Sequence, residues 1–415
     1  MAPMGLQRAL AAMALLAVAC GSANHASTLT PTPSAVGATS TPTSYPSPDN
    51  PSPSNTSPSY PSPTYPIPPT ASSIPTGQCP AVQPAPQFPA STPSNRNLAI
   101  VWLRGSYQYV VRDITDISQP TTVSTFADLG SPQFVSATDV SGFGNNELDQ
   151  VHLAGSRSVV AKMCFAGFAF AWRSDGTAAA YVTDLQTYQG SELHIVSGGQ
   201  NRVASSMPGL PVGGCEQWDC ADRLDLRLLY SPNGAYISLV QSWSGPVFRV
   251  WASDGTLIKS IDSGLTDSRA FPSMSVWSGT GLYFRDAQGV EVWRDGNQSL
   301  VLPLVAWIRP KASPAGGQIV YMERDAFGEA RVSLLDTTTN KVRELARSRS
   351  EPAFLTSRYI WYQGERPCVA GDLYPCNGGG APTTPTGKTY IYDLQAGTET
   401  ESIIAKVWDV WPHPA

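Results

Sequence analysis

The chain has 415 residues, a formal net charge of −5 and 14% charged residues. This composition lacks the clustered Lys and Arg that neutralise phosphate groups, so we expect neither nucleic acid nor an anionic lipid surface as an electrostatic partner. The 11 Trp and 16 Tyr concentrate after residue 100, where such side chains favour strands and binding surfaces.

Residues 1–19 have the features of a signal peptide. Arg8 supplies a positive charge, and Ala9–Ala19 is an apolar run too short to span a bilayer. The small residues before Cys20 resemble the lipobox of bacterial lipoproteins, although Leu is commoner at the position of Ala17. The resemblance implies that Cys20 is lipidated and anchors the chain at the outer face of the cytoplasmic membrane, on the bacterial cell surface. An ordinary signal peptide cleaved nearby is the alternative.

Residues 20–96 show no core-forming pattern. Between Gly21 and Asn95 the only charged residue is Asp49, and residues 41–70 are overwhelmingly Pro, Ser and Thr. Such a segment buries too little apolar area to offset the entropy of ordering, and frequent Pro favours extended polyproline II. We therefore predict a disordered stalk that acts as a spacer, with the composition of O-glycosylated stalks. A neutral linker is the alternative.

Six cysteines follow Cys20, an even number in an oxidising compartment, which predicts disulfides. The predicted pairs are Cys79–Cys164, Cys215–Cys220 and Cys368–Cys376. The first would tie the stalk to the domain, and the other two would each close a small loop. A zinc site is the alternative, but the cysteines form no paired CxxC knuckles and no His is close by in sequence. We expect no metal and no cofactor.

After residue 96 short β-rich runs replace the stalk composition. Leu98–Leu103, Val247–Trp251, Gln318–Met322 and Arg331–Leu335 alternate or are uniformly apolar, and Gly, Asp, Asn and Pro separate such runs. This texture is typical of strands, and no stretch keeps a helical period beyond about ten residues. Residues 97–415 are therefore predicted to be one all-β domain in which helix is a minor component.

A strand–turn–strand unit recurs along this domain. Its turn reads Ser231-Pro232-Asn233-Gly234 in one copy, Ser313-Pro314-Ala315-Gly316 in a second and Ser174-Asp175-Gly176 in a third. Gly supplies the positive φ that such turns need, and Pro presets φ at its own position. The pattern resembles the WD40-like repeat of TolB-type propellers. This resemblance implies a β-propeller fold but says almost nothing about activity. The additional α/β domain of TolB has no counterpart here, so its partners are not carried over.

The length of the repeat predicts the number of blades. Residues 98–415, at roughly 40–45 residues per blade, predict one β-propeller of seven four-stranded antiparallel sheets, with six or eight blades as alternatives. Val407–Trp411, at the end of the chain, has the pattern of the inner strand of a blade. The run that begins at Leu98 has the pattern of the second strand of a blade. We expect these two ends to complete one blade and so remove exposed sheet edges.

The remaining inner strands are predicted from the same pattern. They lie near Gln133–Thr138, Phe168–Trp172, Leu226–Tyr230, Ser273–Trp277, Ile308–Ala312 and Ala353–Thr356. Residues 141–165 fit the repeat least well.

The sequence holds no recognised catalytic motif. HExxH, EF-hand, Walker A and Gly-x-Ser-x-Gly patterns do not occur, so we predict no catalytic residue. Asp139, Glu323, Asp325 and Glu365 lie near blade loops and could in principle serve a hydrolase or lyase. Acids or His converging from three or more blades would favour such an enzyme.

The two small loops predicted to be closed by disulfides carry the candidate ligand-binding residues. These are Trp218 and Tyr374, because rigid loops that present aromatics are common binding devices. The alternative is that the disulfides only stabilise exposed loops. Other aromatics are expected to pack between blades, namely Trp172, Trp277, Trp293 and Trp408.

These observations predict a membrane-anchored, monomeric binding or scaffold module. Its β-propeller would hold a protein, peptide or glycan ligand, and the sequence favours such a module over an enzyme. The alternative is a propeller-type polysaccharide hydrolase or lyase.

Overall fold

A computed structural model describes most of the domain. The described residues are 95–103, 106, 108–144, 147–162, 167–184, 191–207, 227–241, 247–265, 275–303, 306–325, 328–369, 371–372, 376 and 382–413. All of them belong to the second of the two units of the chain, Ile74–Ala415. The predicted signal peptide, the predicted lipidation site Cys20 and the predicted stalk up to residue 94 lie outside the described residues.

The described residues form 28 strands in seven four-stranded antiparallel sheets, numbered blades 1 to 7. From the inner strand outwards, blade 1 consists of β28 (Lys406–Trp411), β1 (Leu98–Leu103), β2 (Gln108–Asp113) and β3 (Thr121–Phe126). Blade 2 consists of β4 (Gly130–Phe134), β5 (Asp139–Phe143), β6 (Glu147–His152) and β7 (Arg157–Lys162). Blade 3 consists of β8 (Gly167–Trp172), β9 (Ala178–Asp184), β10 (Ser191–Ser197) and β11 (Gln200–Met207).

The other four blades follow in chain order. Blade 4 consists of β12 (Arg227–Tyr230), β13 (Tyr236–Gln241), β14 (Val247–Ala252) and β15 (Leu257–Asp262). Blade 5 consists of β16 (Ser275–Ser278), β17 (Gly281–Arg285), β18 (Gly289–Arg294) and β19 (Asn297–Pro303). Blade 6 consists of β20 (Ile308–Ala312), β21 (Gln318–Arg324), β22 (Ala330–Asp336) and β23 (Lys341–Arg347). Blade 7 consists of β24 (Arg349–Phe354), β25 (Tyr359–Pro367), β26 (Thr383–Asp393) and β27 (Thr398–Ser402).

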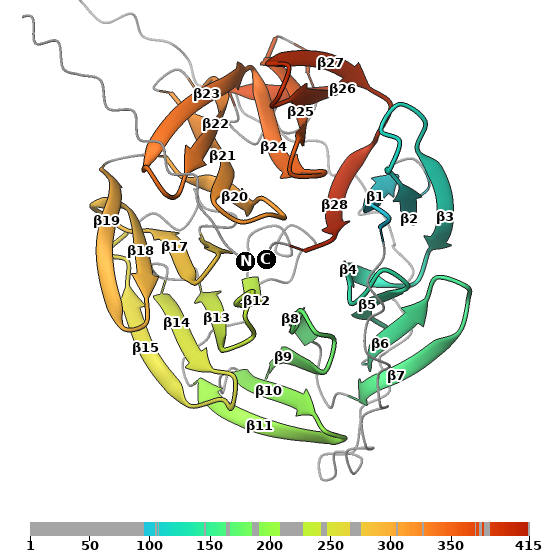
Figure 1. The fold of residues 1–415 in the computed structure, drawn as a ribbon, viewed down its shortest axis with the longest axis vertical. Coiled ribbons are helices and arrows are strands. Elements are labelled where there is room, and N and C mark those ends of the chain that lie inside the picture. Colours follow the sequence, from blue (N-terminus) through green and yellow to red (C-terminus); the bar gives the residue numbers. More distant parts are fainter. Residues whose placement is uncertain are drawn as a thin grey trace, which may run out of the picture. The chain divides into compact units, whose positions relative to one another are not determined.

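The seven sheets stand in a ring, with the inner strands around its centre and β3, β7, β11, β15, β19, β23 and β27 at its rim (Figure 1). This confirms the predicted all-β propeller and its seven blades. The described part of residues 141–165, which fit the repeat least well, lies in and between three ordinary strands of blade 2, β5, β6 and β7. Within the part of the chain that the structure describes, no helix is long and apolar enough to cross a bilayer.

The ring closes where the sequence predicts, in blade 1. The last strand β28 pairs antiparallel with the first strand β1, and Leu98 lies opposite Trp411 while Trp102 lies opposite Lys406. Blade 1 therefore takes its inner strand from the end of the chain and its other three strands from the beginning. Pairing of the two ends leaves neither of them as an open sheet edge.

The antiparallel order of the strands gives the ring two distinct faces. We call the face where the inner strands begin the upper face, and the face where they end the lower face. The described chain starts at Asn95, just before β1, and stops at His413, just after β28, so both ends lie at the lower face. β11 ends and β12 begins at the upper face, and so do β25 and β26, respectively.

The predicted repeat turn lies at the lower face. In three blades the glycine of this turn, Gly176, Gly234 or Gly316, has a φ of 68° or 69°. Its N–H donates to the carbonyl of the residue three positions earlier, at 2.8, 2.8 and 2.9 Å respectively. A side chain with Cβ rarely adopts this conformation, which explains why the three turns share Gly at this position.

The core lies between the blades. One buried cluster joins Ile195 of blade 3 to Ile237 and Trp251 of blade 4, and another joins Tyr283 of blade 5 to Tyr321 of blade 6. Because both faces of each sheet are apolar, each blade is stabilised only when it has a neighbour on both sides. The closed ring provides this arrangement, which makes closure in blade 1 essential to the whole domain.

Candidate functional site

Four consecutive blades, 6, 7, 1 and 2, carry a β-bulge at the same level of their inner strands, near the upper face. In blades 6, 7 and 2, two inner-strand residues oppose one residue of the second strand, and the first of the two is Arg309, Glu351 or Ser131. In blade 1 the extra residue of the inner strand is Trp408. The φ angles of Arg309, Glu351 and Ser131 are 51°, 55° and 51°. Left-handed conformations of residues with a Cβ are costly and often occur at functional sites, and bulges redirect side chains. We therefore take this arc of bulges as the candidate site.

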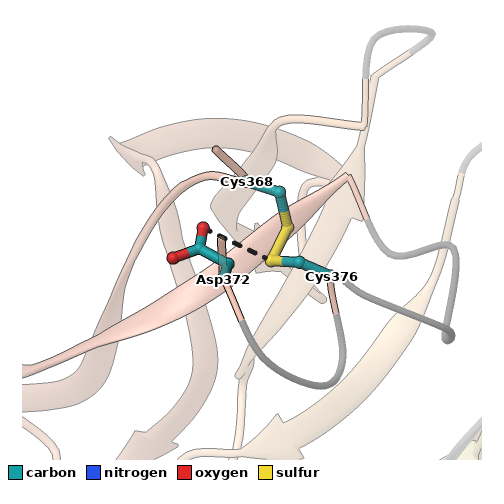
Figure 2. A group of neighbouring side chains, drawn as sticks. All are labelled: Cys368, Asp372 and Cys376. Carbon is teal, nitrogen blue, oxygen red and sulfur yellow. Dashed lines mark hydrogen bonds between the residues drawn. A yellow bond between two sulfur atoms is a disulfide. The ribbon is translucent and has the colours of Figure 1, made fainter. Parts of the chain in front are cut away.

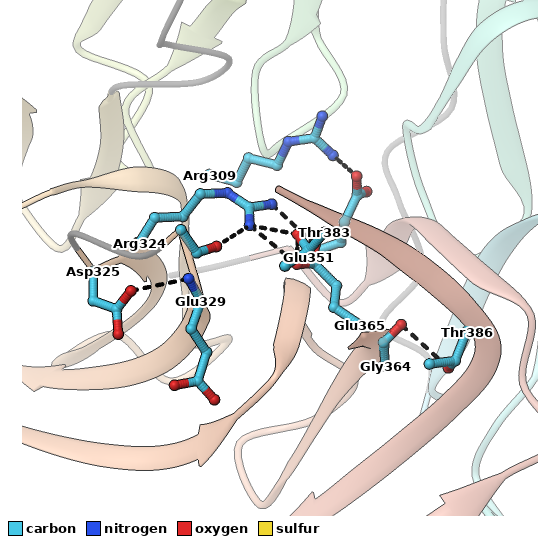
Figure 3. Close-up of polar contacts among 10 residues, drawn as sticks. Arg309, Arg324, Asp325, Glu329, Glu351, Gly364, Glu365, Thr383 and Thr386 are labelled. Atoms are coloured by element: carbon cyan, nitrogen blue, oxygen red, sulfur yellow. Dashed lines mark hydrogen bonds and ion pairs between the residues drawn. The ribbon is translucent and has the colours of Figure 1, made fainter. Parts of the chain in front are cut away.

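A row of three ion-paired side chains joins three of these blades, and we call it the charged row. A guanidinium nitrogen of Arg309 contacts Oε1 of Glu351, and Nζ of Lys406 lies 3.1 Å from Oε2 of Glu351. Figure 3 shows the contact between Arg309 and Glu351. The charges alternate as positive, negative and positive. The charged row therefore has an excess of one positive charge in a chain whose net charge is −5.

The carboxylate of Glu351 is ionised and still in contact with water. Burial alone would raise its pKa, but Arg309 and Lys406 hold the pKa of Glu351 below its usual range. Its side chain is nevertheless 24% exposed. Glu351 thus acts as a hydrogen-bond acceptor at neutral pH and has no proton to give to a leaving group.

Asp409 occupies the same inner strand as Lys406 and connects blade 1 to blade 2. Its Oδ2 accepts the backbone N–H of Phe134 at 2.8 Å and lies 3.1 Å from Nε2 of His413. Burial raises the pKa of Asp409, but His413, the N–H of Phe134 and the charge of Lys311 outweigh it, so the pKa is lowered. This carboxylate is engaged in holding the closing strand to its neighbour.

The inner strands carry only two acids, and neither is free. Glu351 belongs to blade 7 and Asp409 to blade 1, and both are paired with cationic or N–H groups. A set of acids from three or more blades, which would favour an enzyme, is therefore not present on the seven inner strands.

Three aromatic rings lie on blade 1 beside the charged row, and we call them the ring cluster. The ring centroids of Trp102 and Tyr109 are 4.6 Å apart, and those of Tyr109 and Trp408 are 5.3 Å apart. The planes are tilted by 49° and 69°. Burial raises the pKa of Tyr109 to about 12, so its hydroxyl stays protonated. Because Lys406 lies opposite Trp102 in the β1–β28 register, the ring cluster and the charged row meet on blade 1.

The expected packing of Trp408 between blades is wrong. Trp172, Trp277 and Trp293 are indeed buried in clusters between neighbouring blades. Trp408 is 37% exposed and contacts Tyr109 of its own blade. The reason is the bulge, because the extra residue breaks the alternation of side chains that places the other tryptophans in the core.

Among the described strands, β25 and β26 form the longest hairpin, with 9 and 11 residues, and we call its extension at the upper face the arm. The predicted Cys368–Cys376 disulfide is present near its tip, with a Cα–Cα distance of 5.6 Å (Figure 2). Arg366 donates to both oxygens of Asp372, at 2.6 and 2.8 Å, and the N–H of Val369 donates to Oδ2 at 2.7 Å. These hydrogen bonds lower the pKa of Asp372 to about 2.

The same tip brings three atoms of metal-ligand type together. The sulfurs of Cys368 and Cys376 and a carboxylate oxygen of Asp372 lie within 4.8 Å of one another. A disulfide sulfur carries no thiolate charge and is therefore a poor metal ligand. With the disulfide formed, Cys368 and Cys376 act as a covalent cross-link beside the ion pair of Arg366 and Asp372. The 3.7 Å approach of the Cys376 sulfur to Asp372 in Figure 2 is a packing contact for the same reason.

The base of the arm is fixed to blade 6 by one arginine. Arg324 donates to both oxygens of Glu365, at 3.0 and 3.1 Å, and also to Thr383 and to the carbonyl of Gly328, each at 2.9 Å (Figure 3). Thr383 in turn donates to Glu365 at 2.6 Å. The Glu365 side chain is 6% exposed. A bidentate, mostly buried pair of this kind sets the orientation of the arm as well as holding it.

The four acids that could have served an enzyme do not form one set. Asp139 lies in the lower-face turn of blade 2, where Ser136 and Thr138 donate to it. Asp325 is paired with Arg331 at 2.8 Å, Glu365 is paired with Arg324, and Glu323 lies within β21. The acids of blades 6 and 7 lie towards the upper face and Asp139 lies at the lower face, so they are on opposite sides of the ring.

Several predicted residues lie outside the described residues. These are Trp218 and Tyr374, and the cysteines Cys79, Cys164, Cys215 and Cys220.

The charged row was not predicted from the sequence, although a pattern for the bulges exists. Ser131, Arg309 and Glu351 each precede a Pro within an inner strand. Pro lacks the N–H of a sheet ladder and is found in strands mainly at edges and bulges. A Pro two positions before the end of the inner strand therefore indicates the bulge in blades 6, 7 and 2, whereas β28 of blade 1 has a bulge without a Pro.

No protein-family model and no curated protein matches the sequence. The described chain is a seven-bladed β-propeller. Solved structures with a similar fold include TolB from Acinetobacter baumannii, with 17% identity and a TM-score of 0.37 over 60% of this chain and 62% of that one. A putative TolB from Agrobacterium tumefaciens has 18% identity and a TM-score of 0.36, over 61% of this chain and 90% of that one.

An oligogalacturonate lyase in complex with manganese has 11% identity and a TM-score of 0.41, over 75% of this chain and 79% of that one. The match to the Acinetobacter TolB, in contrast, covers 62% of that protein, which is less than two thirds of its length. Likenesses at these identities and TM-scores concern the fold and leave the activity open.

Proposed function

We propose that the chain is a binding or scaffold module outside the cytoplasmic membrane, anchored by a lipid on Cys20, whose upper face holds a protein, peptide or glycan. The observation that supports this most directly is the grouping on one face. The charged row, the ring cluster and the arm all belong to the upper face of blades 6, 7 and 1, while both described chain ends lie at the lower face.

The position of the chain ends favours presentation of the upper face. A tether that continues from Asn95 leaves the domain at the lower face, so a membrane anchor at Cys20 would leave the upper face free. The Pro-rich segment between them, at about 3.1 Å per residue in an extended form, gives a spacer long enough to hold the propeller away from the membrane.

The residue types favour binding over acid–base catalysis. Trp, Tyr and Arg are enriched at the energetic centres of interfaces. Here Trp408 and Tyr109 lie on blade 1, and Arg309 of blade 6 is joined to that blade through Glu351 and Lys406. A hydrolase or lyase would need acids poised to exchange protons, whereas Glu351 and Asp409 are held ionised by their partners. A polysaccharide-cleaving activity is therefore the less favoured alternative.

Matched substitutions on the two faces test this proposal. In the full chain, Lys406→Gln and Trp408→Ala alter the upper face, and Lys341→Gln and Leu257→Ala alter exposed residues at the lower face. Binding of each purified chain to isolated cell envelope would be measured by co-sedimentation. We expect the upper-face changes alone to reduce binding. Equal effects from both faces would contradict the proposal.

The anchor is tested separately. Cys20→Ser should release the chain from the membrane fraction into the medium, because the variant lacks the acyl chains that make membrane attachment stable. Unchanged fractionation would show that Cys20 is not the anchor.

A further inference from the structure

We propose that the ligand of the upper face is a glycan of pyranose sugars, with hydroxyls on the charged row and an apolar sugar face on the ring cluster. This inference rests on the proposed function and names the chemical class of its ligand.

The hydrogen-bonding pattern of the charged row fits neighbouring hydroxyls. Each hydroxyl has one donor and two acceptor positions. Glu351 is an ionised acceptor between two donors, Arg309 on one side and Lys406 on the other. Two adjacent hydroxyls of a sugar can therefore donate to Glu351 and accept from a cation at the same time. Charge-assisted hydrogen bonds of this kind are about twice as strong as neutral ones.

An acidic peptide fits the same row less well. Its carboxylate would approach the two cations only beside Glu351, whose negative charge lies between them. Like charges in a partly desolvated site repel strongly. The excess of one positive charge still allows a single acidic sugar in the chain of the ligand.

The ring cluster supplies the apolar part of the contact. One face of a pyranose ring is lined by C–H groups, which pack against aromatic rings. Trp408 is 37% exposed, and Tyr109 fixes its orientation from the side, with ring centroids 5.3 Å apart. Trp408 and Lys406 are separated by one residue on β28. A short oligosaccharide can therefore span both groups of side chains.

Both parts of this surface are held in place before a ligand arrives. Ion pairs from three blades fix the charged side chains, and the bulges fix the backbone beneath them. Binding then orders few additional side chains, which lowers its entropic cost. Lys406 and Glu351 keep exposed fractions of 38% and 24%, so water can exchange for sugar hydroxyls.

Calorimetric titration of the full chain tests the inference. The probes are cellotetraose, the tetramer of N-acetylglucosamine, and a trisaccharide with a single glucuronate as the acidic sugar. We expect at least one probe to bind. Trp408→Ala should weaken binding about tenfold or more by removing the stacking contact. Glu351→Gln should weaken the binding of a neutral sugar by a similar factor, because a charged hydrogen-bond acceptor is lost. Lys341→Gln and Leu257→Ala, at the lower face, should bind like the unaltered chain.

A fourth probe, a hexapeptide of Glu and Leu, tests the acidic-peptide alternative, for which Glu351→Gln should have the opposite effect on binding. If the row recognises acidic peptides, Glu351→Gln will strengthen binding of this peptide, and that result would overturn the glycan inference. Absence of binding to every sugar, while upper-face changes still abolish envelope binding, would also overturn it and leave the proposed function intact. If upper-face changes affect neither sugar nor envelope binding, both proposals fail.

Discussion

Asp409 should be a principal stabilising residue of the closing blade. Its Oδ2 accepts the N–H of Phe134 across the junction of blades 1 and 2 at 2.8 Å, and His413 adds a second contact at 3.1 Å. Asp409→Ala removes a charged hydrogen bond and leaves a buried N–H without this partner, which costs about 3 kcal/mol. Asp409→Asn keeps an oxygen acceptor and loses the charge, so about 1 kcal/mol is expected.

The thermal midpoint gives the measurement. At about 2 cal/mol/K per residue, a domain of this length has an unfolding entropy of about 0.7 kcal/mol/K, so Asp409→Ala should lower Tm by about 4 °C. Asp116→Asn is the control and should change Tm by less than about 1 °C, because Asp116 is exposed and its carboxylate accepts hydrogen bonds from the neighbouring Ser118. If Asp409→Ala behaves like this control, the carboxylate does not hold the ring closed.

The pH dependence of the same variants has a definite sign. The pKa of Asp409 is lowered in the folded state, so its contribution is complete above its ordinary pKa of about 4 and is lost as pH falls further. The unaltered chain should therefore lose stability on acidification below that pH by more than Asp409→Asn does. Parallel curves for the two chains would refute the role of the charge.

Two further changes address the arm. Replacing Cys368 and Cys376 together by Ser opens a short loop, and we expect a loss of about 2.5 kcal/mol of local stability, seen as faster hydrogen exchange in β25 and β26 with little change in the other blades. Arg324→Lys keeps the charge but loses the bidentate geometry, so about 1–2 kcal/mol should be lost, measured as a lower midpoint in urea, and a neutral result would show that the arm does not depend on blade 6.

The fold was predictable because its determinants are local in sequence. Gly176, Gly234 and Gly316 occur at turns that require positive φ, and each turn is followed by a β-rich run. Repeating this unit leaves little choice of architecture, and the pattern at the two chain ends also predicted closure. The predicted Ile308–Ala312 strand coincides with β20 for this reason.

The candidate site was less predictable because its contacts join distant blades. Arg309, Glu351 and Lys406 each lie on a different blade, and nothing in their local patterns indicates that they meet. Strand periodicity also assigned Trp408 to the core, because the alternation of side chains between the two faces of a sheet assumes that every residue of the strand is paired in a regular ladder. One unpaired residue reverses that assignment, and only the Pro residues in neighbouring inner strands indicated that bulges occur at this level.

The candidate site and the ring closure share one strand, which makes ligand binding and stability interdependent. Lys406 and Trp408 belong to β28, and Lys406 ties this strand to blade 7 through Glu351. A ligand that contacts Lys406 and Glu351 together binds only when β28 is in place, so it must stabilise the closed ring. At a ligand concentration of about 100 times Kd the gain is about 2.7 kcal/mol, which corresponds to a rise in Tm of about 4 °C for a domain of this size. At the same ligand concentration a tenfold weaker binding in Trp408→Ala should reduce the rise to about 2 °C, and Leu257→Ala should keep it in full. A ligand that binds without raising Tm would have to contact a surface away from the closing strand.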